Sequence, residues 1–144
     1  MKLHEKMNKY LADQMVMYIK LHNLHWYIKG SGFFTLHAKL EEVYDATATT
    51  IDEVAERMLM IGASPVASLK GALKLTGLSE LDDKPIASDE TVKILLKDVE
   101  WLVDSTKEMI GIAEGEGDTG TVDMFSGFLG HYEKLLWMLK SYLS

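Results

Sequence analysis

Hydrophobic residues recur at helical spacing along nearly the whole chain. One such pattern runs from about Leu3 to Lys29, and a second runs from about Phe34 to Ile61. Gly30-Ser31-Gly32 separates the two patterns, because glycine is unfavourable inside a helix. Gly62-Ala63-Ser64-Pro65 ends the second pattern. The first half of the chain is therefore predicted to form two long helices joined by a tight turn.

The second half repeats this arrangement after a long connection. An irregular stretch reaches Ala87 and contains a possible short helix at Leu69–Leu75. Ser88 is predicted to be the N-cap of a third long helix, which ends at the glycine-rich segment 115–120, and a fourth helix follows to the C-terminus. Two helices, a crossover and two more helices are typical of an all-α, ferritin-like four-helix bundle with a long crossover carrying a short extra helix. We expect one domain over residues 1–144.

Composition narrows the class of protein. The chain has 144 residues, a net charge of −7 and no cysteine. An acidic surface argues against general binding of nucleic acid, because phosphate contacts require basic residues. No run approaches the ~20 apolar residues of a membrane span, and the N-terminus has no signal-peptide pattern. We therefore expect no membrane partner and a cytoplasmic location.

Four side chains form a candidate metal-ligand set. His25 and His37 each lie six residues from Ser31, so two antiparallel helices meeting there would place the histidines at the same height. Asp52 and Glu56 are one helical turn apart, and two imidazoles with two carboxylates suit iron, manganese or zinc. Along one helix, however, the carboxylates are roughly 22 and 28 Å from His37. One chain therefore holds two half-sites, not a complete site.

The spacing along the second helix suggests how the halves meet. His37 and Glu56 lie symmetrically about a midpoint between positions 46 and 47, as do Glu41 and Asp52. All four fall on one helix face, about 120° from the apolar face. An isologous dimer with this helix antiparallel to its copy would bring His37 opposite the partner's Glu56 and create two equivalent sites. The alternative is that the carboxylates form a solvated face and the histidines are ordinary polar residues near a turn.

The same residues carry a resemblance to a known family. His22-Asn23-Leu24-His25-Trp26-Tyr27-Ile28-Lys29-Gly30, Leu36-His37, Asp52 and Ala55-Glu56-Arg57 resemble the Dps family of mini-ferritins. This resemblance implies a dodecameric shell that oxidises Fe(II) with peroxide or dioxygen and stores ferric mineral inside. It implies that His25 and His37 of one subunit and Asp52 and Glu56 of its neighbour form a ferroxidase site across the two-fold interface. Two iron ions per site are expected, and zinc or other divalent metals could substitute.

Five further residues receive weaker assignments. Glu41 matches a position near the second metal, and Trp26 resembles a tryptophan beside the site that could donate an electron, although packing is the simpler interpretation. The acidic residues Glu116, Asp118 and Asp123 lie near the predicted connection between the third and fourth helices. They could line an iron-entry pore or could simply be solvated.

DNA binding is where the chain departs from the family pattern. DNA-condensing relatives often carry a lysine-rich arm, whereas Lys2, Lys6 and Lys9 here lie within or next to the first predicted helix. We therefore expect weak or absent DNA binding. Two alternatives to an iron-storing ferroxidase stay open: a nucleoid-binding shell with a vestigial metal site, and a helical bundle with a structural zinc site.

Overall fold

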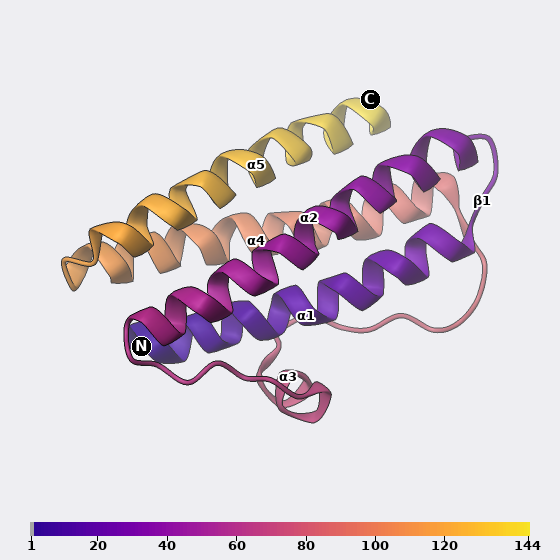
Figure 1. The fold of residues 1–144 in the computed structure, drawn as a ribbon. Coiled ribbons are helices and arrows are strands. Elements are labelled where there is room, and N and C mark those ends of the chain that lie inside the picture. Colours follow the sequence, from indigo (N-terminus) through magenta and orange to yellow (C-terminus); the bar gives the residue numbers. More distant parts are fainter. Residues whose placement is uncertain (1) are drawn as a thin grey trace. The chain divides into compact units, whose positions relative to one another are not determined.

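The computed structural model describes residues 2–144 and is almost entirely helical. Its long helices are α1 (Leu3–Tyr27), α2 (Phe33–Met60), α4 (Ser88–Gly115) and α5 (Thr119–Leu143), and the short helix α3 (Leu69–Leu75) lies between α2 and α4 (Figure 1). The chain divides into two compact units. The first, here called the histidine unit, spans Met7–Thr91, and the second joins the N-terminal residues up to Lys6 with Val92–Ser144.

The first helix is shorter than predicted. It ends at Tyr27, and Ile28–Lys29, predicted to be helical, form the strand β1. This strand pairs in parallel with β2 (Ile86–Ala87), a segment predicted to be irregular. Gly30 follows with a φ of +106°, a conformation that favours glycine and ends the extended segment. Pairing with a distant segment therefore overrides the local helical pattern.

Ser88 ties this turn to the start of α4. It was predicted to be an N-cap, but α4 begins at Ser88 itself, and the acidic residues Asp89 and Glu90 occupy the first turn. The Ser88 hydroxyl donates to the carbonyl of Lys29 (2.7 Å) and accepts from the backbone N–H of Gly32 (3.1 Å). Its hydrogen bonds thus hold the α1–α2 connection.

The remaining boundaries follow the sequence closely. Helix α2 starts and ends one residue earlier than predicted, while α3 has the predicted bounds. Helix α5 starts at Thr119, inside the segment 115–120 that was predicted to precede it, because the carboxylate of Asp118 accepts a hydrogen bond from the backbone N–H of Thr121 and caps the helix. Helix capping by aspartate satisfies a backbone donor that the first turn leaves unpaired.

Apolar side chains of α1 and α2 are buried as the periodicity predicted. The buried residues of α2 are Leu36, Leu40, Val43, Thr47, Val54 and Met58. The long connection to α4 is fixed to α1 by Asp13, whose carboxylate accepts hydrogen bonds from the Thr76 hydroxyl (2.6 Å) and the Gly77 N–H (2.9 Å). These contacts hold α1, α2 and the crossover together within the histidine unit.

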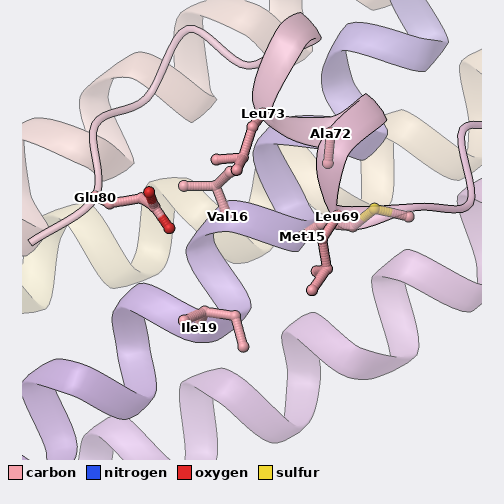
Figure 2. Close-up of a pocket in the computed structure, with 7 residues that line it drawn as sticks. All are labelled: Met15, Val16, Ile19, Leu69, Ala72, Leu73 and Glu80. Carbon is pink, nitrogen blue, oxygen red and sulfur yellow. The ribbon is translucent and has the colours of Figure 1, made fainter.

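A small apolar pocket lies between α1 and α3. Figure 2 shows its lining residues, which are Met15, Val16, Ile19, Leu69, Ala72, Leu73 and Glu80, and its volume is about 220 Å³. Ile19, Leu69 and Leu73 are each more than half exposed. None of the helices described over residues 2–144 is long and apolar enough to cross a membrane.

Candidate metal centre

The two predicted histidines lie together where α1 ends and α2 begins. Their rings are stacked, with centroids 3.7 Å apart and an angle of 13° between the planes. Nδ1 of His25 donates to the carbonyl of His37 (2.7 Å), and Nδ1 of His37 donates to the carbonyl of His25 (2.8 Å). The prediction that both imidazoles lie at one height beside the turn is confirmed.

These reciprocal hydrogen bonds fix the tautomer of both neutral rings. A carbonyl oxygen can only accept, so the proton of each neutral imidazole must be on Nδ1. Nε2 of His25 and of His37 therefore keeps a free lone pair, which is the form that binds a metal ion. Metal-binding histidines generally donate their other ring N–H to a carboxylate or carbonyl, which fixes the tautomer and the orientation of the ring. Backbone carbonyls have this role for both His25 and His37.

Glu41 lies beside this pair in the same chain. Its Oε1 is 3.8 Å from Nε2 of His25, whose side chain is almost completely buried. Metal–ligand bonds to imidazole nitrogen and carboxylate oxygen are about 2.0–2.2 Å long, so a single ion between these two atoms could bind both. The sequence ranked Glu41 below Asp52 and Glu56, but Glu41 is the carboxylate that one chain brings to the histidines.

Aromatic rings for which no role was predicted surround the two histidines. Phe33 stacks on His37 with ring centroids 4.9 Å apart, and Tyr44 meets His25 edge-on at 5.2 Å. His22, one turn before His25, stacks on Tyr44 at 3.8 Å. Tyr44 lies three residues after Glu41 on α2, and this spacing on one helix face is the signal that could have identified it.

The Tyr44 phenol is also affected by the negative charge of Glu41, one turn earlier on α2. Desolvation raises the pKa of the Tyr44 phenol above its usual value, and the negative charges of Glu41 and Asp45 raise it further. The phenol therefore stays protonated at neutral pH.

Asp52 and Glu56 are not brought to the histidines within one chain. Both are exposed on α2, which runs without interruption from Phe33 to Met60. The helical rise keeps them roughly 22 and 28 Å from His37. Among residues 2–144, no three or more His, Cys, Asp and Glu side chains form a group that could hold a metal ion. A single copy therefore presents a histidine half and, separately, a carboxylate half.

The other predicted functional residues have local surroundings of their own. Trp26 is two-thirds exposed, and its ring meets the edge of His22 at 5.3 Å. Glu116 accepts a hydrogen bond from the backbone N–H of Leu3 (3.2 Å), and Asp118 caps α5, so both of these carboxylates have local structural partners. Asp123 is exposed on α5, and the suggested pore role of these three residues stays a prediction.

Comparisons with known proteins give one consistent result. A ferritin-like domain model matches residues 4–144. The chain is 42% identical over 140 residues to "DNA protection during starvation protein 2" of Bacillus anthracis, covering 97% of this chain and 95% of that protein. Dps from Staphylococcus aureus superposes with a TM-score of 0.95 at 38% identity, covering 99% and 95% of the two chains. Dps from Listeria innocua, in a structure soaked with cobalt, superposes with a TM-score of 0.96 at 37% identity. That match covers 99% of this chain and 92% of the Listeria chain.

These matches span the long helices and the crossover with its short helix. They confirm the predicted fold class, an all-α ferritin-like four-helix bundle. They also confirm the resemblance drawn from His25, Trp26, His37, Asp52 and Glu56, although the matches assign no role to any single residue. The chain belongs to the Dps family of ferritin-like proteins.

Proposed function

We propose that this protein is an iron-storing mini-ferritin that oxidises Fe(II) at sites shared between two copies of the chain. His25 and His37 of one copy and Asp52 and Glu56 of the other bind ferrous iron as substrate, with Glu41 contributing beside His25. Twelve chains enclose the ferric mineral in a hollow shell within the cytoplasm.

One observation carries this proposal. The Nε2 lone pairs of His25 and His37 are free, and the matching carboxylates Asp52 and Glu56 lie exposed farther along the same helix, symmetrically placed about positions 46 and 47. An antiparallel pairing of α2 with its copy brings each histidine half opposite a carboxylate half and forms two equivalent sites. Carboxylates offset the charge of the ion, and neutral imidazoles suit iron and zinc.

A site for two ions suits the reduction of hydrogen peroxide. Two ferrous ions each give up one electron, and peroxide takes both electrons and two protons to form two molecules of water. A one-electron reduction by a single ion would release hydroxyl radical instead. When one ferrous ion is bound, we propose Trp26 as the donor of the second electron, since its indole ring contacts His22 in the cluster beside the site. Dioxygen is the alternative oxidant.

Assembly into a shell is supported by exposed apolar surface. The largest exposed apolar side chains include Phe34, Leu59, Met60, Leu69, Trp26 and Trp137. Exposed apolar side chains in such numbers are typical of surfaces that other chains cover. Covering them with further copies accords with a closed oligomer of twelve.

Removal of iron and peroxide would also account for DNA protection, which several relatives carry in their names. A protein can protect DNA by direct binding or by removing the reagents that damage it. The net charge of −7 favours the second route, because a DNA-binding surface must neutralise phosphates.

The shared site is tested by complementation between two inactive variants. The first carries His25→Asn and His37→Asn, which removes Nε2 but keeps an N–H donor near the position of Nδ1. The second carries Asp52→Asn and Glu56→Gln, which remove charge and keep shape. Each alone should lose nearly all rapid Fe(II) oxidation by peroxide, measured by the growth of ferric absorbance.

Reassembly of the two variants together should restore activity. In a mixed dimer one site lacks all four ligands and the other keeps all four, so random mixing makes roughly a quarter of the sites whole. The native mass of each preparation should be about twelve times 16.2 kDa, or ~194 kDa. A mixture that reassembles to this mass but stays as inactive as its parents would contradict the shared site.

A further inference from the structure

His37 is the less enclosed of the two stacked imidazoles. The side chain of His25 is 6% exposed, whereas His37 is only half-buried. The hydrogen bond from Nδ1 to the carbonyl of His25 holds one atom of the His37 ring, and the ring plane can still tilt about that atom. The Nε2 lone pair lies in the ring plane, so its direction depends on a contact that holds the plane.

Phe33 makes such a contact. Its ring stacks on His37 with centroids 4.9 Å apart and an angle of 20° between the planes, which is the geometry of an offset aromatic stack. His25 stacks on His37 as well, at 3.7 Å and 13°. One face of an imidazole has room for a single stacked ring, so Phe33 and His25 cover opposite faces. His37 is therefore held between two rings.

The position of Phe33 is fixed by the turn before α2. Phe33 is the first residue of α2, and its backbone N–H donates to the carbonyl of Gly30 (3.1 Å). The N–H of the preceding Gly32 donates to the Ser88 hydroxyl (3.1 Å). Residues four apart lie on one helix face, and helical side chains lean toward the N-terminus, so His37 lies over Phe33. The turn and the helix together hold the Phe33 ring against His37.

We propose that Phe33 is a positioning residue, which fixes the ring plane of His37 and thereby the direction of its Nε2 lone pair. This inference rests on the proposed function, and it adds to the site a residue that does not touch the metal. A ring already held in its binding orientation loses less conformational freedom when a metal binds, so the stack strengthens binding. The free energy of an offset aromatic stack corresponds to a change of about 2- to 10-fold in a binding constant.

The experiment measures Co(II) binding to the assembled protein by calorimetry. Phe33→Leu and Phe33→Met each keep an apolar side chain and remove the ring, so one can be measured if the other does not assemble, whereas Phe33→Tyr keeps the ring. Phe128→Leu is the matched control, because Phe128 is also half-buried and packs edge-on against Phe125 (5.2 Å) in the other compact unit. Thermal melting and native mass are recorded for every variant, which separates loss of stability from loss of metal binding.

Phe33→Leu and Phe33→Met should each weaken Co(II) binding by about 2- to 10-fold, while Phe33→Tyr and Phe128→Leu should bind Co(II) as the wild type does. Wild-type affinity in the ring-free variants, whatever their melting temperature, or an equal loss of affinity in Phe33→Tyr, would overturn the positioning role. Failure of the proposed function has a different signature: Asp52→Asn with Glu56→Gln would leave Co(II) binding unchanged, or the wild type would bind no Co(II), and the role of Phe33 would fall with it.

Discussion

His25 and His37 each donate a hydrogen bond from Nδ1 to the backbone carbonyl of the other residue. The carbonyl of His25 belongs to the last turn of α1, where carbonyls have no partner within the helix. His37 therefore satisfies one carbonyl of that helix end while keeping its own Nε2 free. The same two side chains thus have a structural role through Nδ1, while the chemical role that we propose for them would use Nε2.

Separating these roles gives the first prediction. In metal-free protein with a chelator present, His37→Ala should lower the free energy of unfolding by about 0.5–1.5 kcal/mol, because the donor to His25 is lost. His37→Asn should recover most of this loss, since its amide N–H can replace Nδ1–H. Urea unfolding at fixed protein concentration measures both variants.

His131→Ala is the control for this experiment, because His131 is exposed on α5, and it should change stability little. If alanine and asparagine at position 37 destabilise the protein equally, the carbonyl contact has no part in holding α1.

Ser88 gives the second prediction. Ser88→Ala removes the acceptor for the N–H of Gly32, a buried residue, and the donor to the carbonyl of Lys29. A buried N–H left without a partner costs about 1–3 kcal/mol, so the urea midpoint should fall accordingly. Ser126→Ala is the matched control, since that hydroxyl is exposed and bonds only to the carbonyl one turn back, at Val122. A Ser88 variant as stable as the Ser126 variant would show that the connection is held by other contacts.

The third prediction concerns DNA. With a net charge of −7, the protein should not shift linear DNA in a gel at physiological salt and neutral pH without added divalent metal. Of the N-terminal lysines, Lys6 is engaged in an ion pair with Glu108 at 3.2 Å. Tight binding that weakens steeply as salt is raised would instead favour the nucleoid-binding alternative.

The sequence predicted what depends on periodicity and spacing. The long helices, the bounds of α3 and the height of His25 beside His37 all follow from local patterns and one turn. It could not predict the pairing of Ile28–Lys29 with Ile86–Ala87, because two-residue strands carry almost no local signal. The contacts of the Tyr44 ring with His22 and His25 were missed for a related reason: a tyrosine at helical spacing gives no indication of which rings it meets on another helix.

In the proposed site, the carboxylate half comes from a second copy of the chain, which the sequence of one chain does not describe. Symmetry about positions 46 and 47 predicted that Asp52 and Glu56 need a partner, and their exposed placement on α2 agrees with that interpretation. Their role as ligands stays a prediction until the complementation experiment is done.

The bonds from Ser88 to Lys29 and Gly32 also have a consequence for the order of folding. They join residues that are 59 and 56 positions apart, so they can form only after the crossover has been synthesised and has returned to the turn. Closing such a long loop is a slow, late step compared with the formation of single helices. A nascent chain that ends before Ser88 therefore lacks the bonds that fix the turn between His25 and His37. The imidazole pair therefore gains its final rigidity only once the crossover is complete, when most of the chain exists.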